Sequence, residues 1–328
     1  MLSRVADAVY WMNRYVERAE NVARFVDVSF HLALDLPGGG ASHWSALVAT
    51  TGDEELFRVR HGEPTPRSVV RFLTFDRDYP SSVVSCLART RENALRSREI
   101  ISSEMWQQLN EMYLLVKDAE RELEGASHDA TPYDLFAAVK RACQGFVGTT
   151  YLTMTHDEAW HFGRLGRLIE RADKTSRILD VKSYMFEEGG PIVPSQDEIE
   201  WAALLKSASA FEMYRKRHGV IEPSKVVDFL VLDRKFPRSI FYCLRKGERS
   251  LHAITGTPLD GRANRAEREI GKLHAELEFA EVADISTLGP NAWLDALQGK
   301  LNAVGAAIAE SFYFGPAAEL PSEEPREG

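Results

Sequence analysis

Two segments of the sequence carry arginine and glutamate side chains at helical spacing. Residues 14–28 read RYVERAENVARFVDV, and residues 167–181 read RLIERADKTSRILDV. On a helix that turns 100° per residue, i,i+3 and i,i+4 neighbours can form ion pairs, and most of these charges share one broad face. The candidate site residues are Arg14, Glu17, Arg18, Glu20, Arg24 and Asp27 in the first segment, and Arg167, Glu170, Arg171, Asp173, Arg177 and Asp180 in the second.

Charged faces of this kind allow two kinds of chemistry. Arginines can hold a carboxylate through two parallel hydrogen bonds while acidic groups hold an amine, which makes a binding site for a substrate or a partner. In an enzyme, Glu17 or Glu170 would act as the general base, and arginines would stabilise an anionic intermediate. The third alternative is a purely structural network in which the charges lock helices together.

The charges of the two segments have diverged less than the apolar residues between them. Five charged positions are identical, whereas Tyr15 is matched by Leu168 and Phe25 by Ile178. A solvated face of ion pairs worth ~0.3–0.5 kcal/mol each would not retain its individual charges in this way. We therefore expect buried or ligand-facing networks. The sequence leaves a structural lock and a binding site as open alternatives.

Further matches follow in the same order along the chain. WSAL (44–47) aligns with WAAL (201–204), and VVRFLTFDRDYPSSVVSCL (69–87) aligns with VVDFLVLDRKFPRSIFYCL (226–244). These matches predict a tandem duplication, with one helical repeat over 1–153 and a second over 154–313 that packs on the first as one unit. Residues 314–328 are rich in Pro and Glu and are expected to be a disordered tail.

Helical periodicity dominates the sequence, and strand-like alternation bounded by hairpin signals is missing. Apolar side chains fall on one side of the first predicted helix at Trp11, Tyr15, Ala19, Val22 and Val26. Long segments such as 81–125 and 160–186 contain few helix-breaking residues. The predicted fold is all-α: an internally duplicated antiparallel helical bundle with two pseudo-symmetric halves.

Composition narrows the functional classes. The net charge of -9 argues against nonspecific binding to nucleic acid or to an anionic membrane, since both favour a basic surface. No stretch approaches the ~18 apolar residues that a membrane span needs. The three cysteines are scattered without a CxxC pair, and the first residues do not resemble a signal peptide. We therefore expect a cytoplasmic protein.

Two turns with the pattern DR-x-[YF]-P precede predicted helices, at residues 76–80 and 233–237. Helix N-termini favour anions, and Arg77 or Arg234 could reinforce an anion site there. The favoured alternative is a structural Asp–Arg ion pair, here called the Asp–Arg clasp, that fixes the turn before the helix. The tripeptide Arg-His-Gly also recurs, at 60–62 and 217–219. A helix that ends at this point with glycine as its C-terminal cap would account for the recurrence.

Other chemistry is weakly indicated. Glu158 and His161 have the i,i+3 spacing of helical di-iron sites, but Val5 and Ala8 occupy the matching positions of the first repeat, so no metal site is expected. Gly-rich phosphate-binding motifs are absent, and no cofactor is expected. Cys86 and Cys143 lie in apolar helical contexts typical of core residues.

The chain resembles the alpha-E family, which is named for its helices and its Glu-Arg motif. The resemblance rests on ERAEN-x-AR after MLSRVADAVYWMNRY, on HDEAWHFGRLGRLIERAD-x-TSR-x-LDV, on SSEMW (102–106) and on the two DR-x-[YF]-P turns. It covers nearly the whole chain. Its motif falls on Glu17, Arg18, Glu20 and Arg24, and on Glu170, Arg171, Asp173 and Arg177. Lys174 stands where the first copy has Asn21, so the two copies need not be equivalent.

The resemblance implies a pathway rather than a reaction. Genes of the family typically neighbour a circularly permuted ATP-grasp amidoligase and a transglutaminase-like peptidase, sometimes with a proteasome-like β-subunit. This context implies a role in forming and breaking peptide or amide bonds. We therefore expect an accessory or substrate-binding subunit of such a system rather than an enzyme, with the Glu-Arg helices as the binding surface.

Overall fold

A computed structural model describes residues 1–35, 41–125, 133–187 and 194–313. The predicted tail, 314–328, lies outside the described residues. The described parts contain helices and no strands, which confirms the predicted all-α class. The helices are α1 (Ser3–Asp35), α2 (Ala41–Ala49), α3 (Glu54–His61), α4 (Pro66–Phe75), α5 (Val83–Arg96), α6 (Ser103–Gly125), α7 (Tyr133–Thr153), α8 (Glu158–Glu187), α9 (Pro194–Ser207), α10 (Phe211–His218), α11 (Pro223–Val231), α12 (Ile240–Thr255), α13 (Arg265–Phe279), α14 (Val282–Leu288) and α15 (Pro290–Phe312).

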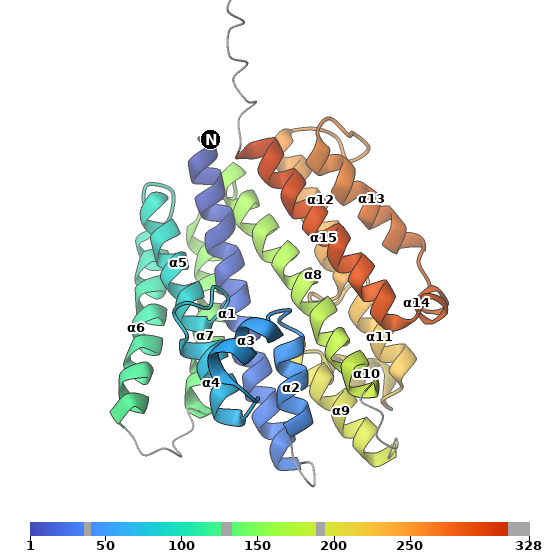
Figure 1. Cartoon of the computed structure of the whole chain (residues 1–328). Coiled ribbons are helices and arrows are strands. Elements are labelled where there is room, and N and C mark those ends of the chain that lie inside the picture. Colours follow the sequence, from blue (N-terminus) through green and yellow to red (C-terminus); the bar gives the residue numbers. More distant parts are fainter. Residues whose placement is uncertain (36–40, 126–132, 188–193, 314–328) are drawn as a thin grey trace, which may run out of the picture.

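Two long helices form the centre of the molecule. α1 and α8, of 33 and 30 residues, pack against each other along much of their length (Figure 1). α5 and α7 pack on α1, while α12 and α15 pack on α8. The predicted Glu-Arg segments therefore lie on the two central helices, where neighbouring helices can cover them.

Two glycines of α8 allow the close approach of the central helices. A Cβ atom on Gly166 would lie 2.4 Å from the backbone oxygen of Tyr10, and a Cβ atom on Gly163 would lie 2.6 Å from the side chain of Asn13. Real Cβ contacts are not this short, so a side chain at position 166 would displace the Tyr10 backbone and one at position 163 would displace the Asn13 side chain. The short interaxial spacing brings long side chains of each helix within reach of the backbone and side chains of the other.

The apolar residues form two large cores on either side of the central pair. The first contains residues of α1 through α7, including Ala19, Val22 and Val26 from the predicted apolar side of α1. The second contains residues of α8 through α15 together with Tyr10 of α1. The duplication of the fold stays a prediction, but the boundary between the two cores falls close to the predicted boundary between the repeats.

The segment 81–125 forms two helices rather than one. α5 ends at Arg96, and α6 begins at Ser103, although the connection contains neither Gly nor Pro. Ser97 donates its hydroxyl to the backbone oxygen of Asn93, and the Ser102 hydroxyl accepts from the backbone N–H of Met105 at the start of α6. Serine side chains thus add hydrogen bonds at the end of α5 and at the start of α6.

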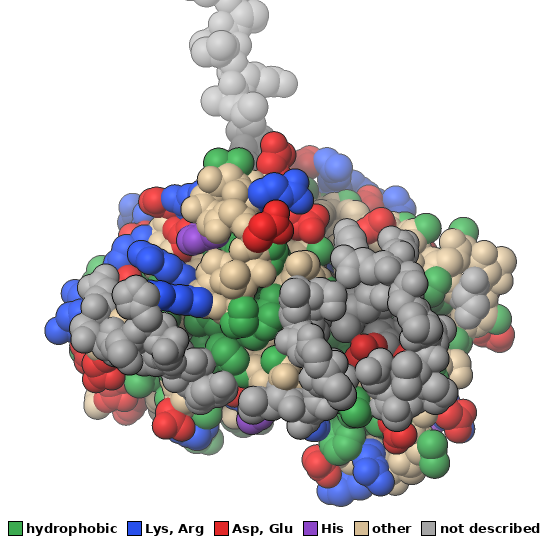
Figure 2. All heavy atoms as spheres, turned by 60° about the horizontal axis from the view of Figure 1, so that its bottom comes forward, with side chains coloured by type: hydrophobic (Ala, Val, Ile, Leu, Met, Phe, Trp, Pro, Cys, Tyr) green, Lys and Arg blue, Asp and Glu red, His purple; other side chains and the backbone are tan. Residues whose placement is uncertain are grey.

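The surface is mixed in charge at the end of the bundle opposite the N-terminus. Basic and acidic side chains both occur around the rim of this face, with a group of hydrophobic side chains nearer the centre of the view (Figure 2). In the described residues, no helix is both long and apolar enough to cross a lipid bilayer.

Candidate functional site

The two Glu-Arg segments exchange ion pairs across the α1–α8 interface. Arg18 of α1 donates to both oxygens of Glu170, with Nε–Oε1 at 2.6 Å and Nη2–Oε2 at 3.0 Å. Arg171 of α8 donates to both oxygens of Glu17, at 2.9 and 2.8 Å. Each glutamate is therefore held in bidentate fashion by the arginine that follows the matching glutamate on the other helix, a geometry that maximises charge-assisted hydrogen bonding.

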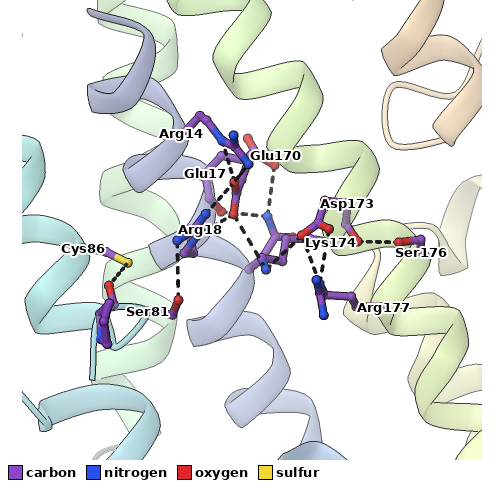
Figure 3. Close-up of polar contacts among 12 residues, drawn as sticks. Arg14, Glu17, Arg18, Ser81, Cys86, Glu170, Asp173, Lys174, Ser176 and Arg177 are labelled. Atoms are coloured by element: carbon purple, nitrogen blue, oxygen red, sulfur yellow. Dashed lines mark hydrogen bonds and ion pairs between the residues drawn. The ribbon is translucent and has the colours of Figure 1, made fainter. Parts of the chain in front are cut away.

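A second arginine binds each of these glutamates. Arg14 reaches Glu170 through Nε and Nη2, at 2.9 and 2.8 Å, and Figure 3 shows Arg14 and Arg18 converging on it from α1. Arg238, which precedes the first residues of α12, reaches Glu17 at 3.1 Å. The glutamate pair is thus enclosed by arginines from three segments of the chain.

The turn before α12 positions Arg238. Ser239 caps the helix by accepting from the backbone N–H of Tyr242, and Thr175 of α8 donates to the backbone oxygen of Arg238. The Arg238 side chain then bridges Glu17 and Glu20, with Nη2–Oε1 of Glu20 at 2.8 Å. Sequence comparison of the repeats missed Arg238 because Ser81 occupies the matching position of the first copy.

The network continues along both helices. Glu20 pairs with Arg24 on α1, and Asp173 pairs with Lys174 and Arg177 on α8, each at 3.1 Å. Asp27 and Asp180 lie further along, where Asp27 pairs with Lys140 of α7 and Asp180 accepts from Gln298 of α15. Apart from these two aspartates, the predicted site residues lie in one continuous region, which contains Arg14, Glu17, Arg18, Glu20, Arg24, Arg167, Glu170, Arg171, Asp173 and Arg177.

Arg167 differs from its counterpart Arg14. Within the described parts of the chain its side chain makes no hydrogen bond and no ion pair, although it lies within electrostatic range of Glu17 and Glu20. Burial and the positive charge of Arg171 lower the pKa of Arg167 to about 10. The two copies of the motif are therefore not equivalent, as the differences at Asn21 and Lys174 already indicated.

The carboxylates are the inaccessible part of the network. The side chains of Glu17 and Glu170 are 0 % exposed, whereas those of Arg14, Arg18 and Arg171 are 14–16 % exposed. Burial alone would raise the pKa of Glu17, but Arg171 and Arg238 outweigh it and lower the pKa to about 2. The pKa of Glu170 likewise lies well below its ordinary value, because Arg18 and Arg14 outweigh burial. Both carboxylates are therefore charged at neutral pH.

Positive charge exceeds negative charge in this region. Among the described residues, four carboxylates (Glu17, Glu20, Glu170 and Asp173) pair with seven cations, and Arg167 adds an eighth without pairing. The paired cations are Arg14, Arg18, Arg24, Arg171, Lys174, Arg177 and Arg238. Partly buried cations in excess of their counterions form a region that attracts anions.

The predicted turns contain an Asp–Arg clasp, but with a different arginine. Asp76 pairs with Arg60 at 2.9 Å, and Asp233 pairs with Arg217, so the Arg-His-Gly helix ends contact the following turns. Arg77 and Arg234 are more than half exposed and pair with Glu120 and Glu278, respectively. Anion binding at Arg77 and Arg234 stays a prediction.

Glu158, Cys86 and Cys143 have structural roles. Glu158 pairs with the amino group of Met1 at 2.9 Å, and no group of three metal-ligating side chains occurs in the described residues. Cys86 and Cys143 are fully buried core residues, as predicted. Burial raises the pKa of the Cys86 thiol to about 12, so this thiol stays protonated at neutral pH.

These features define an all-helical protein with a buried Glu-Arg network between its two longest helices. The chain belongs to the alpha-E family, whose model is described as a predicted alpha-helical domain with a conserved ER motif and matches residues 1–313. Two Glu-Arg pairs of this chain, Glu17-Arg18 and Glu170-Arg171, are the residues that exchange ion pairs between α1 and α8.

Relatives of the chain occur in mycobacteria. Uncharacterised proteins of Mycobacterium bovis and of two Mycobacterium tuberculosis strains are each 24% identical over 333 residues, a match that covers 94% of this chain and 36% of the relative. The chain thus spans about a third of the length of these relatives. No solved structure matches the chain.

Proposed function

We propose that the chain is an accessory, substrate-binding subunit of an ATP-grasp amidoligase system, and that its Glu-Arg network binds an anionic group of the substrate. The observation that carries the proposal is the excess of cations over carboxylates around Glu17 and Glu170. A substrate for amide-bond formation presents a carboxylate, which arginine binds through two parallel hydrogen bonds.

The difference in burial between the carboxylates and the arginines favours the arginines as the groups that bind the substrate. Glu17 and Glu170 are covered, so a ligand amine has no access to them. The side chains of Arg14 and Arg177 are 14 % and 23 % exposed, so an anion can reach them. We therefore assign recognition of the anionic group to the arginines and assign a supporting role to the two glutamates.

A catalytic alternative is less well supported by the geometry. A general base works best when its pKa lies near the working pH. The pKa of Glu17 is lowered to about 2, and that of Glu170 lies well below its ordinary value. Each also has both oxygens engaged by arginine. These properties favour binding over proton abstraction.

The test is co-purification with a circularly permuted ATP-grasp protein from the same genome, followed by an ADP-release assay on amino acids and peptides. We expect stable association and ADP release that depends on this chain. Absence of association, together with ADP release that is unchanged by adding this chain, would overturn the proposal.

Arg14→Met tests the assigned site within that assay. Glu170 keeps Arg18 and Lys174 in this variant, so the protein should fold. Dependent ADP release should fall by about tenfold, since one charge-assisted hydrogen bond is lost. The matched control is Arg268→Met on an exposed position of α13, which should behave as the unchanged protein. Equal activity of both variants would remove the network from the binding site.

A further inference from the structure

A second group of cations lies where α12 packs against the first half of α8. Arg164 of α8 donates to the Ser250 hydroxyl of α12 at 3.3 Å, which brings its guanidinium to the α12 surface. Lys246 and Arg249 stand three residues apart on α12 and therefore share one face of that helix. Arg249 is exposed, while Arg164 and Lys246 are partly exposed, so solvent reaches all three.

These cations have no acidic partner among the residues that the structure describes. Within the described parts of the chain, Arg164, Lys246 and Arg249 form no ion pair with a carboxylate. Burial, followed by the positive charges of Arg249 and Arg164, lowers the pKa of Lys246. Like charges are therefore held together without compensation, which costs free energy in the unliganded protein.

Aromatic rings hold two of the cations in place. The Arg164 guanidinium lies 5.3 Å from the centre of the Trp160 ring, and the Lys246 ammonium lies 5.5 Å from that of Tyr242. Such contacts favour a fixed orientation of a cation over free rotation in solvent. The group is thus partly pre-organised for a ligand rather than a set of unconstrained surface side chains.

The repeat does not account for this group. In the first repeat the positions that match Arg164 and Arg249 hold Trp11 and Glu92. Only Lys246 has a basic counterpart, Arg89. This set of three basic residues therefore does not recur at the matching positions of the first copy, unlike the Glu-Arg motif.

We propose that Arg164, Lys246 and Arg249 form a binding site for a ligand that carries two or more linked phosphates. This site is separate from the Glu-Arg network, and the inference does not rest on the function proposed above. Three adjacent cations match the charge of two linked phosphates, because a terminal phosphate supplies about −1.5 to −2 at neutral pH and the linked phosphate at least about −1 more. A single carboxylate would leave most of the positive charge uncompensated.

An acidic peptide fits the group less well. Its carboxylates are spaced along an extended chain by roughly 3.3 Å per residue and alternate in direction. The proposed site instead groups its cations on two packed helices, close enough for Arg164, Lys246 and Arg249 to affect one another's pKa. Linked phosphates concentrate their oxygens in a comparably small volume.

The test is isothermal titration calorimetry of the full chain with pyrophosphate, ADP, orthophosphate and a glutamate-rich peptide. Pyrophosphate and ADP should bind with a one-to-one ratio, more tightly than orthophosphate, and more weakly as salt is raised. Equal affinity for pyrophosphate and ADP would assign the site to the phosphates alone, whereas tighter binding of ADP would assign it to a nucleotide. Either result supports the proposal.

The variant Lys246→Gln with Arg249→Gln should weaken pyrophosphate binding by roughly a hundredfold, since each charge-assisted hydrogen bond contributes about a factor of ten. Its melting temperature should be unchanged or higher, because like-charge repulsion is removed. The matched control is Arg268→Gln with Lys272→Gln on α13, which should bind as the unchanged protein does. Unchanged binding by the α12 variant, tighter binding of the peptide than of pyrophosphate, or no binding of either phosphate ligand would overturn the proposal.

Discussion

Replacing Glu17 by glutamine tests whether the central ion pairs stabilise the fold. The side chain is fully buried and accepts from Arg171 and Arg238. Its pKa is about 2 in the folded protein and near 4.5 in an unfolded chain. A difference of about 2.5 units at 1.36 kcal/mol per unit corresponds to about 3 kcal/mol of stability at neutral pH. Removing one partner of a buried ion pair costs a similar amount, about 3–5 kcal/mol.

The assay is urea denaturation of Glu17→Gln and of the unchanged protein, first at pH 7. A loss of about 3 kcal/mol in the free energy of unfolding is expected. The matched control is Glu276→Gln, which removes an exposed carboxylate paired with Lys300 and should cost less than about 1 kcal/mol. A loss below about 1 kcal/mol for Glu17→Gln as well would refute the view that this pair stabilises the fold.

The same variant has a defined pH dependence. Because the folded pKa of Glu17 is depressed, its contribution is fully present above pH 4.5 and is lost as the pH falls towards about 2. The difference in stability between the unchanged protein and Glu17→Gln should therefore shrink over this window. A difference that stayed constant from pH 5 to pH 3 would contradict the assigned pKa.

Three further predictions concern packing and accessibility. Gly166→Ala should lower the melting temperature by several degrees in calorimetry, since its Cβ would lie 2.4 Å from the Tyr10 backbone oxygen. Gly299→Ala in α15 meets open space, so its melting temperature should be unchanged or slightly higher. A larger loss for Gly299→Ala than for Gly166→Ala would contradict the packing of α1 on α8. Arg238→Ser should raise the pKa of Glu17 and lower the free energy of unfolding by about 2 kcal/mol in urea denaturation. An unchanged free energy of unfolding would show that the ion pairs of Arg238 with Glu17 and Glu20 do not stabilise the fold. Cys86 should resist iodoacetamide in the folded protein and react after unfolding, as judged by mass spectrometry; rapid labelling of the folded protein would refute its burial.

The sequence identified the central helices and their charged residues but not all of their partners. Spacing along one helix predicted pairs such as Glu20 with Arg24, and this pair forms. The i,i+3 spacing equally allows Arg14 to pair with Glu17, yet Arg14 binds Glu170 on the other helix. Helical periodicity defines a face, and it carries no information about which helix will cover that face.

Two elements of the site were beyond the reach of the repeat comparison. Arg238 has Ser81 as its counterpart, so the comparison gave no signal for an arginine that binds two glutamates. Arg167 is identical to Arg14 in type and position, yet it lacks the ion pair that Arg14 makes. Two identical residues at matching positions therefore need not make the same contacts, because a neighbouring segment can supply a side chain that competes for the same partner.

The exchange of arginines between α1 and α8 has a consequence for synthesis on the ribosome. When the chain has emerged only as far as Thr153, Glu17 lacks both Arg171 and Arg238, and Tyr10 lacks the second core into which it packs. Burying Glu17 at that stage would leave an unpaired charge. The ion pairs that hold Glu17 can therefore form only once α8 and the start of α12 have been translated, more than 150 positions after Glu17 itself.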